Sequence, residues 1–288
     1  MIRAETRGAF VFATLSAPAT RNALSDAMVA DLLEAVTRAE SLPPVRALVI
    51  RGDGGHFCSG GDFSRFRSLM ATPAPAIGAD PIATFNRAFG SLLERLHAAQ
   101  VTTVAVVEGA AMGGGVGLAA CCDFVLSADS AQFGMPEATL GLPPAQIAPF
   151  VAARLGEGPA LRLMLTGRRI KADEALACGL VDEVASGDAL DRRLTALLTE
   201  LGRAEPAALR SIKAILQRRR SSSLSTSLDF AATRFAAALR SGTAAEGLAA
   251  LTAKRAASWV TAPGSAPAPA STSAQPAAQT SAPDGTPT

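Results

Sequence analysis

Two glycine-rich turns, each shortly after an apolar segment, constrain the fold of this chain more than any other feature. Residues 56–62 (HFCSGGD) follow the apolar segment 46–50, and residues 112–117 (MGGGVG) follow the apolar segment 104–107. Apolar segments of strand length that pass through glycine into a helical pattern are typical of strand–turn–helix units. Repeated units of this kind predict an α/β fold with a mainly parallel sheet and helical crossovers.

The periodicity divides the chain into three parts. Residues 1–200 are predicted to form an α/β core, with a β-hairpin over 2–15 and a helix capped by Ser25. Residues 201–261 are predicted to be a helical oligomerisation region. Residues 262–288 contain only Ala, Pro, Ser, Thr, Gln and Gly apart from one Asp, so we expect a disordered tail. The helices predicted after the core strands are 147–155, 159–165, 173–177, 189–201, 206–217, 228–239 and 244–257.

Composition and charge exclude several classes of protein. The formal net charge of +2 argues against an electrostatic nucleic-acid binder. No apolar run approaches the roughly 20 residues that cross a bilayer, and the first residues do not resemble a signal peptide. The four cysteines have no CxxC spacing and are interpreted as reduced thiols rather than a metal or disulfide site. We therefore expect a soluble, cytoplasmic protein with no metal, no nucleic-acid partner and no membrane partner.

The turns and one carboxylate indicate a type of chemistry. Each turn leaves backbone N–H groups free where a strand is followed by a helix, and such groups can stabilise a developing oxyanion. Glu137, in QFGMPE, is a carboxylate that could move protons at the adjacent carbons. Together they suggest chemistry on an acyl thioester through an enolate. Structural alternatives are open: Gly113 and Gly115 fit close packing, Asp62 fits a helix cap, and Glu137 itself could be structural.

The order and spacing of several motifs resemble the crotonase superfamily, the enoyl-CoA hydratase/isomerase group, from about residue 2 to residue 260. That resemblance implies a ClpP-like spiral of ββα units with a C-terminal helical trimerisation region, assembled as a homotrimer or homohexamer. It also implies acyl-CoA substrates and no cofactor beyond the coenzyme A of the substrate thioester. The motifs are RNALS (21–25), HFCSGGD (56–62), EGAAMGGG (108–115), CD (122–123), AQFGMPE (131–137), LTG (165–167), ALACGLVD (175–182), EGL (246–248) and KR (254–255).

The resemblance also implies roles for particular residues. By motif position, the backbone N–H groups of Gly61 and Gly114 form the oxyanion hole, and Glu137 is the general acid/base. Coenzyme A is expected near Arg21, Ala23 and Leu24, with Arg21 as a phosphate contact. Gly61 and Gly114 complete this binding set.

The sequence departs from the family pattern at Gly117. Typical hydratases of the family have a first glutamate there, in addition to the one that matches Glu137. Three interpretations follow: a one-glutamate hydratase, a double-bond isomerase that needs one base, or a CoA-binding protein without turnover. We favour hydration of the 2,3-double bond of an enoyl-CoA, with the isomerase as runner-up.

A narrower resemblance supports hydration. Residues 85–93 and 140–150 are similar to the isohexenylglutaconyl-CoA hydratases of acyclic terpene breakdown, which also have glycine at the position of Gly117. The methylglutaconyl-CoA hydratases of leucine breakdown have related substrates. Branched glutaconyl-type thioesters are thus candidate substrates, and Arg65 or Arg87 could pair with their distal carboxylate, although both also fit ordinary surface arginines.

Overall fold

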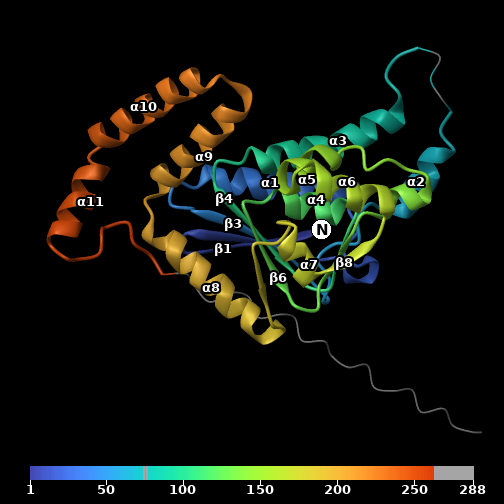
Figure 1. Cartoon of the computed structure of the whole chain (residues 1–288), viewed down its shortest axis with the longest axis horizontal. Helices are drawn as coiled ribbons and strands as arrows, with labels where there is room; N and C mark the ends of the chain where they lie inside the picture. Colours follow the sequence, from blue (N-terminus) through green and yellow to red (C-terminus); the bar gives the residue numbers. More distant parts are fainter. Residues whose placement is uncertain (74, 76, 263–288) are drawn as a thin grey trace, which may run out of the picture.

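The centre of the molecule is a twisted sheet, mostly parallel (Figure 1). The computed structural model describes residues 1–73, 75 and 77–262, and within them this sheet has six strands in the order β1-β2-β3-β4-β6-β9. Strands β1 and β2 form the antiparallel hairpin predicted around Gly8, and every other neighbouring pair is parallel. The strands are β1 (Ile2–Arg7), β2 (Phe10–Leu15), β3 (Ala47–Gly52), β4 (Thr102–Val107), β6 (Phe124–Ala128) and β9 (Glu183–Ala185). The predicted parallel α/β core is confirmed.

A second, smaller sheet was not predicted. It contains β5 (Ala110–Met112), β7 (Gln132–Gly134) and β8 (Arg169–Lys171), with β5 parallel to β7 and β7 antiparallel to β8. Strands of three residues are too short to show a period in the sequence. Because β5 follows β4 and β7 follows β6, these two main-sheet strands are each followed by a short strand and then by helix, which is the ββα unit expected from the resemblance.

Helices cover both faces of the main sheet. Alternate residues of β2 point to opposite sides: Val11, Ala13 and Leu15 join the larger apolar cluster, while Phe10 and Phe12 join the smaller one. The larger cluster includes buried residues of α1, α3, α4 and α5, and the smaller includes the leucine face of α8. The helices of the core are α1 (Asp26–Ser41), α2 (Phe63–Met70), α3 (Pro81–His97), α4 (Gly114–Cys121), α5 (Ala148–Leu155), α6 (Glu157–Thr166), α7 (Ala172–Ala177) and α8 (Gly187–Arg203).

Helix caps match the sequence signals. The Ser25 side chain accepts a hydrogen bond from the Met28 N–H at 3.2 Å, as predicted for the start of α1. The Asp62 carboxylate accepts from the N–H of Ser64 at 2.9 Å and so caps α2. The cap interpretation of Asp62 is therefore confirmed.

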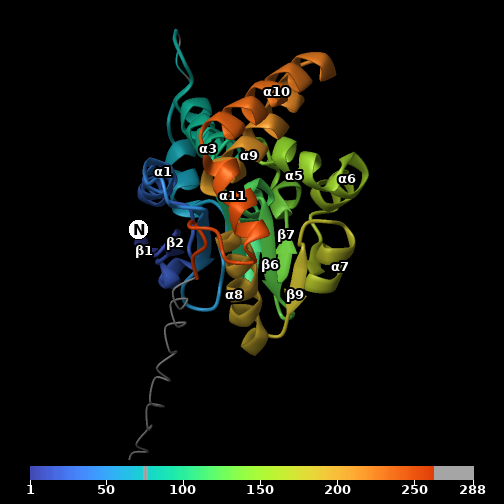
Figure 2. The same ribbon diagram turned by 90° about the vertical axis from the view of Figure 1, so that its left-hand side faces the viewer.

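The last three helices form an arm at one side of the core (Figure 1), and in the view turned by 90° α11 passes in front of the core (Figure 2). They are α9 (Pro206–Ser221), α10 (Leu224–Arg240) and α11 (Thr243–Thr252), and their only buried residues are Ser227 and Ala250 within the described part of the chain. The predicted final helix, 244–257, was too long. Its true end is fixed by Lys254, whose φ of +50° is left-handed, and by a hydrogen bond from Arg255 N–H to Ala250 O. The predicted disordered tail lies outside the described residues, apart from residue 262.

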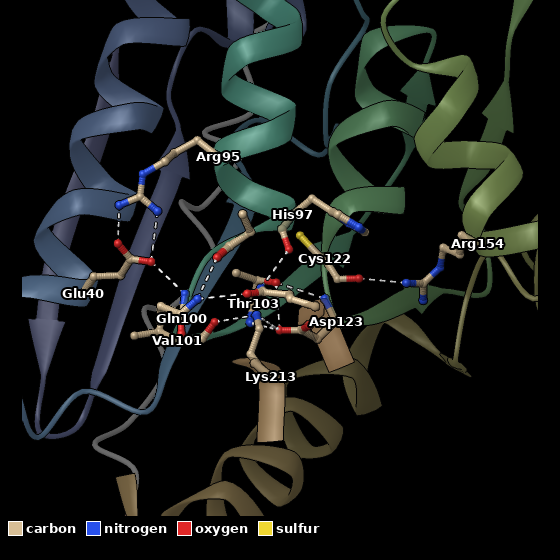
Figure 3. Close-up of polar contacts among 12 residues, drawn as sticks. Glu40, Arg95, His97, Gln100, Val101, Thr103, Cys122, Asp123, Arg154 and Lys213 are labelled. Atoms are coloured by element: carbon tan, nitrogen blue, oxygen red, sulfur yellow. Dashed lines mark hydrogen bonds and ion pairs between the residues drawn. The ribbon is translucent and has the colours of Figure 1, made fainter. Parts of the chain in front are cut away.

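Polar contacts attach α9 to the core (Figure 3), in addition to Leu209, which packs against the smaller apolar cluster. Lys213 Nζ donates to Val101 O at 2.7 Å and pairs with the Asp123 carboxylate. Asp123 in turn accepts from the N–H of Thr103 at 2.7 Å. Gln217 accepts from the Gln100 side chain at 2.9 Å. Charged and amide side chains therefore connect α9 to the chain just before β4 and just before β6, two interior strands of the main sheet.

Candidate functional site

The two glycine-rich turns lie side by side. Cys58 and Ala111 form a parallel bridge: Cys58 N–H donates to Ala110 O at 3.0 Å, and Met112 N–H donates to Cys58 O at 2.9 Å. Gly60 has a φ of +93°, and a Cβ there would lie 2.8 Å from Met112 O. Only glycine allows this backbone conformation and this close approach.

Gly61 and Gly114 both lie next to Leu24. Gly61 forms a parallel bridge with Leu24, and a Cβ at Gly114 would lie 2.8 Å from Leu24 Cδ1. Gly114 is the first residue of α4, where helical N–H groups have no partner within the helix. In the described part of the chain, no hydrogen bond uses the N–H of Gly61 or Gly114. Two free backbone donors therefore lie in one small region.

Glu137 lies beside the start of α4. It belongs to the short 3-10 helix η2 (Pro136–Leu140), and a Cβ added to Gly113, which has a φ of +50°, would lie 2.6 Å from Glu137 Oε1. The absence of a side chain at Gly113 thus provides the space that the Glu137 carboxylate occupies. The position agrees with the favourable placement of an anion at a helix N-terminus.

The environment of Glu137 disfavours its charged form. Oε2 is buried and has no hydrogen-bond partner within the described residues. Burial raises the pKa of Glu137, and the hydrogen bond from its own backbone N–H lowers it in part. A carboxyl whose pKa is moved toward neutrality can both take and return a proton.

The position of the missing first glutamate is filled by an apolar side chain. A Cβ at Gly117 would overlap Ile147 Cγ2 and lie 2.9 Å from Ile147 Cβ. Ile147 is buried and is part of the large apolar cluster. Ile147 thus occupies the space next to Gly117.

The predicted coenzyme A segment lies against the first turn. Ser59 N–H donates to Arg21 O at 2.9 Å, and Leu24 N–H donates to Gly60 O at 2.8 Å. Arg21 is exposed, and among the described residues its side chain has no hydrogen-bond or ion-pair partner. Ala23 lies between these two backbone contacts. The structure therefore brings Arg21, Ala23 and Leu24 to the predicted site.

Asn22 was missed by the sequence analysis. Its side chain is fully buried, accepts from Ala17 N–H at 2.9 Å, and donates to the carbonyls of Asp53 and His56 at 2.9 and 2.8 Å. Its φ of +58° is left-handed, which asparagine tolerates better than most residues. Asn22 joins the 21–24 segment to the first turn, and its place in the RNALS motif was the available signal.

Two aromatic side chains, Phe66 and Phe89, lie against the two glycines. A Cβ at Gly61 would lie 3.0 Å from Phe66 Cε2, and one at Gly114 would lie 3.3 Å from Phe89 Cζ. Phe66 and Phe85 are in edge-to-face contact at 6.2 Å between ring centroids. Phe85 and Phe89 of α3 are partly buried, and Phe89 also packs against the large apolar cluster.

The remaining polar residues near the turns have structural partners. Burial raises the pKa of the Cys58 thiol to about 12, and its sulfur accepts from Gly60 N–H, so it is an inert thiol. All four cysteines are free, as predicted. Arg65 pairs with Asp26 at 3.4 Å, and Arg87 pairs with Glu94 at 2.5 Å.

No group of three or more potential metal-ligating residues was found among the described residues. None of the helices in the described ranges is long and apolar enough to cross a membrane.

Comparisons with known proteins agree on one family. The family model for enoyl-CoA hydratase/isomerase matches residues 5–262. A probable enoyl-CoA hydratase of Mycobacterium bovis is 34% identical over 244 residues, which is 84% of this chain and 91% of that protein. The crystal structure of an enoyl-CoA hydratase/isomerase from Marinobacter aquaeolei has a TM-score of 0.87 and 40% identity, covering 90% of this chain and 99% of the other. Pseudomonas aeruginosa AtuE has a TM-score of 0.86 and 43% identity, with the same coverage.

Proposed function

Because the chain belongs to the enoyl-CoA hydratase/isomerase family, we propose that it adds water across the 2,3-double bond of an enoyl-CoA. That membership confirms the family expected from the motifs. The observation that best supports the proposed chemistry is the position of Glu137, whose unpartnered carboxylate oxygen is buried beside the free N–H groups at the start of α4.

The proposed mechanism uses the three residues together. The thioester carbonyl oxygen accepts hydrogen bonds from the N–H groups of Gly61 and Gly114. As water adds at C3, negative charge moves onto that oxygen, where each such donor is worth roughly 3–4 kcal/mol in other enzymes. Glu137 takes a proton from the attacking water and returns it to C2 as the enolate collapses. The raised pKa of Glu137 suits both steps, since the same group acts first as base and then as acid.

The coenzyme A part of the substrate is assigned to the 21–24 segment. The free guanidinium of Arg21 would pair with a phosphate, and the backbone at Ala23 and Leu24 would line the groove next to Gly61. The chemistry requires no metal ion or redox cofactor, because every step is a proton transfer or the addition of water.

The acyl group would lie against Phe66, Phe85 and Phe89. An aromatic surface of this kind suits an apolar or branched acyl chain, so branched glutaconyl-type thioesters are the finer candidate within the class. Arg65 and Arg87 already have carboxylate partners. A distal carboxylate would therefore have to displace Asp26 or Glu94, and this predicts that the branched apolar part contributes more to recognition than the second carboxylate.

Isomerisation of the double bond is the second candidate, and it is favoured by one observation. Ile147 fills the space next to Gly117, so the position of the usual first glutamate offers no acid or base. One carboxylate is sufficient to move a proton between C2 and C4. A protein that only binds acyl-CoA is the third outcome.

A single labelling experiment tests these candidates. The protein is incubated in H₂¹⁸O with panels of 2-enoyl-CoA and 3-enoyl-CoA esters, including a 3-methylglutaconyl thioester. Label in a 3-hydroxyacyl product supports hydration, whereas migration of the double bond without label supports isomerisation. Binding with neither product would contradict both enzymatic functions.

The role of Glu137 is tested with a matched control. Glu137→Gln should lower turnover by about 10²–10⁴-fold while acyl-CoA still binds. Glu34→Gln, a change of an exposed glutamate on α1, should leave turnover unchanged. Near-full hydration by Glu137→Gln would contradict the assigned role.

A further inference from the structure

Gln146 and Ile147, between η2 and α5, each pack against a glycine of a neighbouring helix. Ile147 packs on α4 at Gly117, where a Cβ would overlap its Cγ2. Gln146 packs on α3 at Gly90, where a Cβ would overlap its Oε1 and lie 2.8 Å from its Cδ. Gly90 and Gly117 are therefore called the 90/117 sockets.

Further contacts hold these two side chains in place. Gln146 Nε2 donates to Asn86 Oδ1 at 2.8 Å, which fixes the amide along α3. Ile147 is 4% exposed, and its carbonyl accepts from Val151 N–H at 3.0 Å in the first turn of α5. Both ends of the docked pair are thus connected to rigid helices.

The docked pair is at the end of the segment that begins with Glu137. Leu142 N–H donates to Glu137 O at 3.0 Å, and Gly141 turns the chain with a φ of +75°. Ala148 N–H then donates to Pro144 O at 2.9 Å. Between Gly141 and Gln146 the chain is largely exposed, so its position depends on its two ends.

We propose that Gln146 and Ile147 are positioning residues for Glu137, and that they act by docking into the 90/117 sockets and fixing the segment 137–147. Gly117 is then a required packing partner of this anchor as well as the position where a glutamate is missing. A longer side chain at 117 and a docked Ile147 exclude each other. The catalytic part of this inference rests on the proposed function of Glu137, but the anchor itself does not.

The test fills the socket at Gly117 in one variant and removes the docked Ile147 side chain in another. Gly117→Ala should push Ile147 out of its socket, raise hydrogen–deuterium exchange in peptides covering 137–147, and lower kcat about 10²-fold with little change in KM. Ile147→Ala removes the docked side chain without filling its socket, so it should also raise exchange in these peptides and lower kcat. Gly158→Ala is the matched control, since a Cβ there has nothing within 4 Å.

Variants with a lower risk of misfolding accompany these. Gln146→Ala removes a half-buried amide from the other socket and should raise exchange in the same peptides. Ile147→Val keeps the docked Cγ2 and loses only the terminal methyl group, so it should raise exchange over 137–147 less than Ile147→Ala does. Turnover is measured with the 2-enoyl-CoA ester that the native protein converts fastest.

The possible results test the anchor and the proposed function separately. Native exchange over 137–147 in both Gly117→Ala and Gln146→Ala would overturn the anchor. A lower melting temperature with unchanged kcat per folded molecule would reduce the pair to a structural role and overturn positioning. A native protein without turnover would contradict the proposed function, while the exchange data would still decide on the anchor.

Discussion

Glu137 combines a cost in folding stability with the catalytic role proposed for it. Its carboxylate is half-buried, and one of its oxygens has no partner among the described residues. Leaving a buried polar group without a hydrogen bond costs folding free energy. That arrangement is typical of sites where reactivity is gained at the expense of stability.

The stability cost of Glu137 should depend on pH. Its pKa is raised by burial, so the folded chain holds the proton more tightly than the unfolded chain does. The folded state therefore loses stability as pH rises from the ordinary value of 4.5 through the folded pKa. At neutral pH, Glu137→Gln should raise the free energy of unfolding by about 1 kcal/mol. Denaturant unfolding at pH values on both sides of 4.5 measures this, and an equal gain at both would contradict the assignment.

Gly117 and Ile147 lead to a second prediction for single residues. Restoring the family glutamate with Gly117→Glu should not restore a second acid, because Ile147 occupies the space. Overpacking of this kind costs about 1–3 kcal/mol, so the variant should unfold at lower denaturant and turn over more slowly. Gly117→Glu with Ile147→Ala should recover part of the stability. Faster hydration by Gly117→Glu alone would show that the space is free.

The helices and strands show what sequence patterns can and cannot predict. The hairpin, the Ser25 cap and the strands before both turns were predicted, because each depends on neighbours close in sequence. The three-residue strands of the second sheet were missed because they are too short to have a period. The docking of Ile147 at Gly117 joins residues 30 positions apart, and no local pattern contains it. The residues of the candidate site were proposed from motifs, whereas the contacts that surround them required the structure.

The attachment of α9 gives a prediction at the same scale. Asp123 accepts from both the N–H and the hydroxyl of buried Thr103, at 2.7 and 3.1 Å, and pairs with Lys213 (Figure 3). Asp123→Ala leaves the Thr103 N–H and the lysine without this partner, so unfolding free energy should fall by about 2 kcal/mol. Asp129→Ala, at an exposed position just after β6, is the control. Equal stability of the two variants would show that the network contributes little.

At the scale of the whole molecule, the arm is tied to the core at both ends. Arg46 is 4% exposed and donates to Ala204 O at 3.0 Å and also to Trp259 O. Trp259 Nε1 donates to Arg203 O at 3.1 Å. Between these contacts, α10 and α11 extend away from the core (Figure 1). The arm is therefore held at both ends, and large apolar side chains of α10 and α11 are exposed.

The exposed apolar residues of the arm lead us to expect that the chain forms a homo-oligomer. Leu228, Phe235, Leu248 and Leu251 are 59%, 68%, 63% and 75% exposed. Exposed apolar surface on a well-formed helical arm is typical of contact between subunits. We expect light scattering to give a mass that is three or six times 29.3 kDa. Phe235→Glu with Leu251→Glu should give a monomer of unchanged helix content, whereas Ile77→Glu, at another exposed apolar residue outside the arm, should leave the mass unchanged. A native monomer, or an assembly that survives both charges, would contradict the predicted role of the arm.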